Sequence, residues 1–427
     1  MLVVMKRNNL FLLFLSLLMC PLLSAQNDLQ FYLTSAFRNN PSIKESQNNI
    51  RVKNLDKSLT EAEHIYPQIS LTANYLFVPY FNNDKIVTAN PGPNAVGYDA
   101  SVTNGGLYSA QVNVTKNLFN GGVVDAFNNQ TDLQIKSNEY NYELTKHNLE
   151  KDVTDQYINC WEAQEHYILS NSTADTLKQQ LGITKNLMMK GLVKQSDYLL
   201  LKIEFETQQL AALQAFASLK SAVYQLNVLA GIQDTSMVVL DTVKLNKTAI
   251  STPSKFFTQY ENDSLLILSQ QDVFETKYYP QFNLFFNAGL NAVDFNDIQR
   301  KFGMGAGFNF TLPIYDGSQK SITRQQSQIN LNTIVSNRKN QETLLKNKIK
   351  ESSSQVEYYI SSLQSMASQL EDYNKIIILL NSELMHGQLS MVDYITIIKN
   401  YFDLKKKEIS SSAAYQLALN QFNYWNW

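Results

Sequence analysis

Hydrophobic and polar residues alternate in four short segments of the chain. Each segment places apolar side chains at nearly every second position, with mostly polar residues or glycine between them. This period of two predicts β-strands that have one apolar and one polar face. The segments are Gln68 to Phe77, Tyr108 to Leu118, Gln281 to Leu290 and Phe302 to Leu312.

Two longer tracts have apolar residues at every third or fourth position, which predicts helices. They contain no proline, the strongest helix breaker, and one glycine interrupts each pattern. We predict a long helix, a tight turn and a shorter antiparallel helix in each tract. At about 1.5 Å per residue the long helices would reach roughly 100 Å, so they need lateral partners along their length. The tracts are Val123 to about Ala230, interrupted at Gly191, and Gln319 to about Asn423, interrupted at Gly387.

Three short motifs occur twice in the same order, which predicts a duplicated unit. Phe119 and Tyr315 of the second motif are 196 residues apart, as are Gly191 and Gly387 of the third, whereas Tyr66 and Tyr279 of the first are 213 apart. The motifs are Tyr66-Pro67-Gln68 and Tyr279-Pro280-Gln281; Leu118-Phe119-Asn120-Gly121-Gly122 and Ile314-Tyr315-Asp316-Gly317-Ser318; and Gly191 with Asp197-Tyr198 and Gly387 with Asp393-Tyr394.

The predicted domains follow from these motifs. The first repeat would span residues 26–232, with strands at about 67–79 and 107–119 and a helical tip near 191. An irregular equatorial linker would follow at 233–253. The second repeat would span 254–427, with strands at about 280–290 and 301–313 and a tip near 387. The loop between the first two strands, Phe81 to Gly106, is long and is expected on the outer face of the membrane.

The N-terminus predicts export. Residues 1–25 read as a signal peptide, with Lys6-Arg7 before an apolar run and Ser24-Ala25 at the cleavage site. A lipoprotein interpretation of Cys20 is disfavoured because no small residue precedes it and Pro21 follows. After cleavage only Cys160 remains, which excludes an internal disulfide and suits apolar packing.

Charge and hydropathy narrow the class of protein. The formal net charge is -2 and only 17% of residues are charged, which argues against nucleic-acid binding. No later segment has the apolar length of a transmembrane helix. The alternating segments suit membrane strands, because their apolar faces are rich in Phe, Tyr and Leu while their polar faces carry almost no charge. A half-buried sheet in a soluble protein is the alternative.

Four strands are too few to close a membrane barrel, and open sheet edges do not occur in lipid. The chain is therefore expected to pool its strands with symmetry mates. Three copies give 12 strands, so a cyclic trimer is the simplest closure.

The ordered motifs resemble those of the outer-membrane efflux channel family typified by TolC. The resemblance covers nearly all of the mature chain, from Asn40-Pro41 in the first helix through both tip turns. Each motif alone is weak, but their order and duplication are specific. The resemblance implies an α+β membrane protein: a trimeric 12-stranded transmembrane β-barrel, with four strands per chain, continuous with a long periplasmic α-helical coiled-coil barrel.

The same resemblance implies a function and partners. The protein would be a passive export conduit of a tripartite efflux or type I secretion system, carrying drugs, metabolites or polypeptides. It would lie in the outer membrane of a Gram-negative cell, contact lipid and extend into the periplasm. Its partners would be two copies of itself, a periplasmic adaptor (membrane fusion) protein and a proton-driven or ATP-driven inner-membrane pump. A periplasmic coiled-coil scaffold or adaptor without a pore is the alternative.

The resemblance also implies an entrance gate at the second tip. Asp393 matches a family position that forms a ring of carboxylates, although a capping role at a helix start would also explain it. Thr396 stands where the family has a second Asp, and Leu389 where it has a basic residue. We therefore expect an apolar constriction by Leu389, Met391 and Tyr394. Asp197 is expected to be a cap or a contact near the entrance, and the expected strand–helix junctions are at Pro67, Pro280, Gly121, Gly122 and Gly317.

Enzyme chemistry is not predicted. The sequence has no nucleophile–base motif, phosphate loop or dinucleotide fingerprint, so no cofactor is expected. The histidines have no metal-ligand spacing on one helix face, and no metal is expected. Methionines near the tips favour flexible packing over a path for soft metals.

Overall fold

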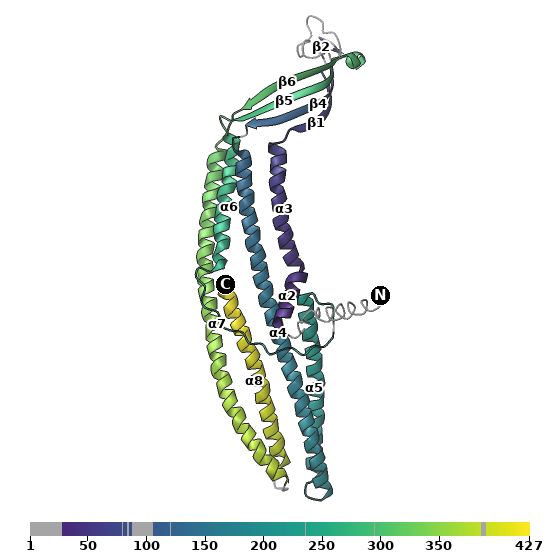
Figure 1. Cartoon of the computed structure of the whole chain (residues 1–427), viewed down its shortest axis with the longest axis vertical. Coiled ribbons are helices and arrows are strands. Elements are labelled where there is room, and N and C mark those ends of the chain that lie inside the picture. The colour runs from purple at the N-terminus through teal and green to yellow at the C-terminus, as the bar shows by residue number, and fades with distance from the viewer. Residues whose placement is uncertain are drawn as a thin grey trace, which may run out of the picture. The chain divides into compact units, whose positions relative to one another are not determined.

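The computed structural model describes residues 28–78, 80–82, 85–87, 106–119, 121–234, 236–293, 295–385 and 390–427. The expected signal peptide, most of the long loop, and Gly387 and Leu389 of the second tip lie outside these residues. The chain divides into two compact units (Figure 1). The strand unit comprises Gln47–Tyr140 and Phe257–Arg338, and the helical unit comprises Met1–Ser46, Asn141–Phe256 and Lys339–Trp427.

The four segments predicted as strands form one antiparallel sheet in the strand unit (Figure 1). Its order is β1-β4-β5-β6, so β1 and β6 are the edges among the described strands. A short separate hairpin, β2–β3, lies within the segment expected to be a loop. The bounds are β1 Gln68–Phe77, β2 Tyr80–Asn82, β3 Lys85–Val87, β4 Gly106–Phe119, β5 Gln281–Ala292 and β6 Phe302–Thr311.

The strand register places the predicted apolar sets on one face. Ile69 pairs with Val114, which pairs with Phe286, which pairs with Ala306. Because residues at one register position share a face and the period is two, the adjacent positions lie on the opposite face. That row is Ser70, Asn113, Asn287 and Gly305. The alternation read from the sequence is therefore the two-faced pattern of a continuous sheet.

The junctions between strands and helices depend on proline and glycine. Pro67 and Pro280 directly precede β1 and β5, where the missing N–H costs no ladder hydrogen bond. Gly121 has φ +60° and follows β4. A Cβ there would lie 2.3 Å from the Cβ of Tyr279, so this glycine packs directly against the junction that leads into β5.

The helices have the lengths that the tracts predicted. α4 (Val123–Met189) and α7 (Gln319–Met385) each contain 67 residues, and α7 begins and ends 196 positions after α4. α8 (Met391–Trp425) likewise begins 196 positions after α5 (Gln195–Ala230). No helix among the described residues has both the length and the apolarity needed to cross a membrane. The remaining helices are α2 (Leu29–Asn39), α3 (Pro41–His64), α6 (Thr258–Glu275), η1 (Lys255–Phe257), η2 (Thr276–Tyr278) and η3 (Phe295–Arg300).

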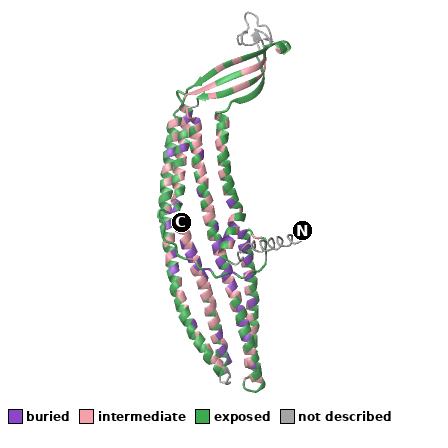
Figure 2. Ribbon diagram, in the orientation of Figure 1, coloured by how far each residue is buried: buried purple, intermediate pink, exposed green. Residues whose placement is uncertain are grey.

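The core of the helical unit forms where α2 packs against α4 and α5 (Figure 2). Tyr157, Ile158 and Cys160 of α4 are almost fully buried in it. Burial raises the pKa of the Cys160 thiol to about 12, so it packs as an apolar side chain, as expected.

The segment between α5 and η1 has no helix or strand over its described residues, 231–234 and 236–254. Side chains from the helices satisfy its backbone instead. Gln164 of α4 accepts from the Leu240 N–H at 2.7 Å and donates to the Leu240 carbonyl at 3.0 Å. Gln416 of α8 accepts from the Leu245 N–H at 2.9 Å. This segment therefore runs as an irregular chain tied to both hairpins.

Candidate entrance at the helical tips

The turn between α4 and α5 is closed by glycine. Gly191 has φ +74°, a left-handed conformation that favours glycine, and its N–H donates to the Met188 carbonyl at 2.9 Å. The N–H of Leu192 donates to the Leu187 carbonyl at 3.0 Å, which satisfies the end of the helix. Lys194 is the N-cap of α5 and makes no side-chain capping bond, while Asp197 lies in the first turn.

The second tip has a different start. Ser390 is the N-cap of α8, and its Oγ accepts from the Asp393 N–H at 3.5 Å. Asp393 is therefore the third residue of the helix, not its cap, and its side chain is exposed. The helix dipole stabilises a carboxylate in the first turn of a helix. This local effect explains an Asp at position 393 independently of any role at an entrance. Thr396 is also exposed, and its hydroxyl donates to the Val392 carbonyl at 2.7 Å.

Met391 and Tyr394 lie in the core of the tip. They are 3% and 1% exposed and pack with Leu177 of α4, Leu201 of α5 and Ile398 of α8. This differs from the expected apolar constriction, because neither side chain reaches an opening while this cluster is intact. Their positions with Ile398, at i, i+3 and i+7, are those of a buried helical seam.

Polar side chains connect the two hairpins beside this core. Asn381 of α7 accepts at Oδ1 from the Tyr394 hydroxyl at 3.3 Å and from Gln180 Nε2 of α4 at 3.4 Å. Burial raises the pKa of Tyr394 to about 12, so its hydroxyl remains a donor at physiological pH. The Thr184 hydroxyl is buried and has no hydrogen-bond partner among the described residues.

An ion pair joins α5 to α8 further along. Lys399 Nζ lies 3.2 Å from Glu204 Oε2, and the Glu204 side chain is only 10% exposed. Gln208 donates to the other carboxylate oxygen at 3.0 Å. Sequence motifs did not reveal this pair. The available signal was a charged residue, Glu204, three positions after the buried Leu201.

Large apolar side chains on one face of the sheet are exposed. Leu71, Met304 and Phe308 are 75%, 73% and 69% exposed. On the polar face, Asn113 Nδ2 donates to Thr72 Oγ1 at 2.7 Å across two strands. A sheet face with apolar side chains this exposed among the described residues is typical of a membrane-facing surface.

Among the described residues, no three or more His, Cys, Asp or Glu side chains are placed together to hold an ion. His147 and His166 instead make structural contacts, to the Tyr424 carbonyl at 2.9 Å and to the Ser410 hydroxyl at 3.1 Å.

Together these features define a protein that pairs a membrane-facing sheet with long helical hairpins. Comparison with known proteins supports this class. Residues 32–232 match the family model described as outer membrane efflux protein. Among curated protein sequences, none matches the chain.

Solved structures share the fold. The CusC structure superposes with a TM-score of 0.73 at 12% identity, covering 93% of this chain and 91% of CusC. The Campylobacter jejuni CmeC outer membrane channel gives 0.71 at 14% identity, covering 93% and 85%. The open state of the Neisseria gonorrhoeae MtrE outer membrane channel gives 0.69 at 12% identity, covering 93% and 88%.

The family match over residues 32–232, the ordered motifs and the shared fold confirm that the chain resembles the TolC-type outer-membrane efflux channel family. It is accordingly an outer-membrane protein of a Gram-negative cell that extends into the periplasm.

Proposed function

We propose that three copies of this chain form a passive export channel, with a 12-stranded barrel in the outer membrane and a helical barrel in the periplasm. The observation that carries this proposal is the sheet. It has an apolar face with many exposed side chains and two unpaired edges, β1 and β6, among the described strands. Adjacent strands alternate in direction, so β6 of one copy would pair antiparallel with β1 of the next, and three copies close the ring.

The channel would work as the outer part of a tripartite efflux or type I secretion system. A periplasmic adaptor and a proton-driven or ATP-driven inner-membrane pump would deliver drugs, metabolites or polypeptides to the helical tips. The channel itself would perform no chemistry. A periplasmic scaffold is disfavoured because a soluble protein would leave the apolar sheet face in water.

At the entrance we propose that the Asp393 carboxylates of three copies form a cation-favouring ring. Thr396, one turn further and exposed, would lie beside it. Leu389 and Gly387 precede it in the sequence and lie outside the described residues. Met391 and Tyr394 would contribute indirectly, because their buried side chains hold the start of α8 in place.

Planar-bilayer recording tests both levels of the proposal. Purified protein is expected to conduct as a trimer, and absence of any conductance would contradict the channel. Asp393→Asn should reduce cation preference, whereas Asp197→Asn, the matched position of the other hairpin, should not. Unchanged selectivity in the first variant would refute the ring but leave the channel intact.

The transport system can be assigned by deleting the gene. Increased sensitivity to small toxic compounds would indicate drug efflux, and loss of a polypeptide from the medium would indicate type I secretion.

A further inference from the structure

A pocket of about 350 Å³ lies where α4 of the first helical hairpin packs against α7 and α8 of the second. All of its lining residues belong to the helical unit. Packed helices leave few voids larger than a water molecule, whereas small-molecule sites have volumes of about 300–1,000 Å³. This pocket therefore has the size of a binding site. Its lining includes Trp161 and Glu165 of α4, Leu363 of α7, and Lys405, Glu408 and Ser412 of α8.

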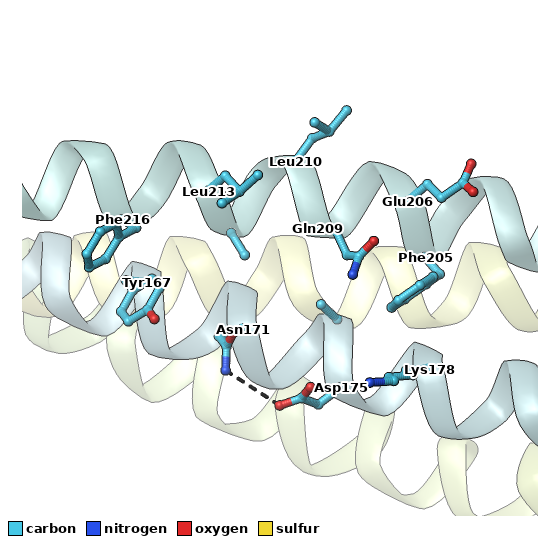
Figure 3. A pocket seen from close by; sticks show the side chains of 12 residues that line it. Tyr167, Asn171, Asp175, Lys178, Phe205, Glu206, Gln209, Leu210, Leu213 and Phe216 are labelled. Carbon is cyan, nitrogen blue, oxygen red and sulfur yellow. Dashed lines mark hydrogen bonds between the residues drawn. The ribbon is translucent and has the colours of Figure 1, made fainter.

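The first hairpin shows why the second has room for this pocket. α7 and α8 begin 196 positions after α4 and α5. Between α4 and α5 the rings of Tyr167 and Phe216 fill the space, with their centroids 5.3 Å apart (Figure 3). The residues 196 positions later are Leu363 and Ser412. Two rings are thus replaced by smaller side chains, which leaves space beside α4 even though α4 packs there.

The charged part of the lining is anionic. Glu165 and Glu408 contribute two carboxylates and Lys405 one ammonium group, which leaves a net formal charge of −1. Lys405 forms an ion pair with Glu408 within α8. The carboxylate of Glu165 is half-buried, and no hydrogen bond or ion pair reaches it from the described residues. The negative charge of the pocket therefore resides at Glu165.

The apolar part of the lining suits a ring or a short hydrocarbon chain. Trp161 is only 8% exposed yet lines the pocket together with Leu169, Leu363 and Ile409. Indole attracts cations more strongly than other aromatic side chains do. A carboxylate beside an indole and aliphatic walls has the chemistry that recognises an ammonium group attached to an apolar body.

We propose that this pocket binds amphipathic organic cations, such as primary amines attached to an aryl or alkyl group. The ammonium group pairs with Glu165, and the apolar body occupies the space that the aromatic pair fills in the first hairpin. Because α4, α7 and α8 all contribute walls, an occupied pocket stabilises the packing of the two hairpins against each other. This site goes beyond the proposed channel, since it is complete within one chain.

The larger groove between α4 and α5, of about 630 Å³, has different chemistry (Figure 3). Its Asp175 accepts from Asn171 at 3.5 Å, and its Glu206 pairs with Lys202 at 3.6 Å. Leu213 in its wall is 67% exposed, so its apolar surface is poorly enclosed. This groove provides a control position within the same chain.

Three probes with one apolar body separate charge from hydrophobicity. They are 4-phenylbutylamine, 4-phenylbutanol and 4-phenylbutyrate, which are cationic, neutral and anionic at neutral pH. Isothermal titration of the purified full chain in a non-ionic detergent should show the tightest binding for the amine. Glu165→Gln should weaken amine binding at least about tenfold and leave the alcohol unchanged, because a charge-assisted hydrogen bond is lost while the side-chain volume is kept. Lys405→Gln should tighten amine binding, because it frees the carboxylate of Glu408.

Two further variants test the location. Ser412→Phe introduces the ring found at the matched position, Phe216, and should abolish amine binding by filling the pocket. Asp175→Asn, in the groove between α4 and α5, should leave amine binding unchanged.

Equal amine affinity in the wild type and Glu165→Gln would overturn the proposal, as would equal affinity for all three probes. Amine binding that survives Ser412→Phe, or that is lost in Asp175→Asn, would also overturn it, because the cation would then lie elsewhere. The titration counts sites per chain, so a missing trimer or missing conductance would contradict the proposed channel without changing this result.

Discussion

Replacing Tyr394 with alanine is expected to loosen the helical tips without touching an exposed surface. The ring is 1% exposed and packs against Leu177, Leu201 and Ile398 from three helices. Truncation of a buried aromatic ring costs about 3–5 kcal/mol. Tyr394→Phe keeps the ring and loses only the 3.3 Å hydrogen bond to Asn381, which costs about 0.5–1.5 kcal/mol.

Limited trypsin digestion measures this loosening locally. Lys185 and Lys202 lie inside α4 and α5 near the tip and are exposed, but cleavage there requires the helix ends to unfold. When opening and closing are fast, cleavage follows the free energy of opening, at tenfold per about 1.4 kcal/mol. Tyr394→Ala should therefore accelerate cleavage about 100-fold or more, and Tyr394→Phe by about two- to tenfold.

Thr396→Ala is the matched control, because it is exposed in the same helical turn and should change cleavage little. Unchanged cleavage in Tyr394→Ala, together with altered conductance, would refute the packing role. Tyr394 would then line the opening, as the family resemblance led us to expect.

Three further perturbations test other parts of the structure. Gly121→Ala should lower the melting temperature of the purified protein more than Gly122→Ala. Both glycines have positive φ, but only at Gly121 would a Cβ lie 2.3 Å from Tyr279. Equal decreases in melting temperature would contradict the contact. His147 stacks between Tyr424 and Trp427, and its burial lowers its pKa. The neutral ring therefore contributes its full stabilisation of the fold above about pH 6.5, and this contribution is lost as the pH falls through the folded-state pKa. Melting at pH 7.5 and 5.0 should show this loss, and His147→Phe should reduce it. Hydrogen bonds from Arg324 hold the pKa of Glu275 at about 2, so this pair stabilises the fold above about pH 4.5 and is lost as pH falls towards 2. Arg324→Lys breaks the two-point contact at 2.7 and 2.8 Å and should lower the melting temperature at pH 7. Melting curves that coincide with the wild type would count against it.

Periodicity predicted the secondary structure well because each signal is local. Four stretches of period two became the four main strands, and the glycine-interrupted tracts became α4–α5 and α7–α8. The sheet order could not be predicted, since it depends on pairing between β4 and β5, which are separated by the 161 residues 120–280. The hairpin β2–β3 was missed because its strands have only three residues each, too few for a periodic pattern.

The entrance was predicted less completely. The spacing of Ser390 and Asp393 is a capping pattern that can be read from the sequence. The sequence alone did not show at which residue α8 begins, so it could not distinguish a capping role of Asp393 from a role in an entrance ring. Met391 and Tyr394 were expected to line an opening although their spacing already indicated a buried seam. Glu204 and Lys399 meet only because α5 and α8 pack in one register, and no motif within either helix specifies that register.

The two tips differ in a way that predicts where the entrance opens. At the start of α8, Met391, Tyr394 and Ile398 bury apolar surface against α4 and α5 of the same chain. The positions 196 earlier are Gln195, Tyr198 and Lys202, which are polar and largely exposed. If neighbouring copies of the proposed trimer pack as the two hairpins pack within one chain, these residues form the contact between copies. That contact is then weaker at the tip than the contact within a chain, and opening should separate neighbouring copies first. A cross-link between Lys202→Cys and Ile397→Cys of adjacent copies should therefore hold the entrance closed and abolish conductance until it is reduced. The equivalent link within one chain, Ile398→Cys to Leu201→Cys, should leave opening unchanged. If the link within one chain abolished conductance and the link between copies did not, opening would instead separate the helices within each chain.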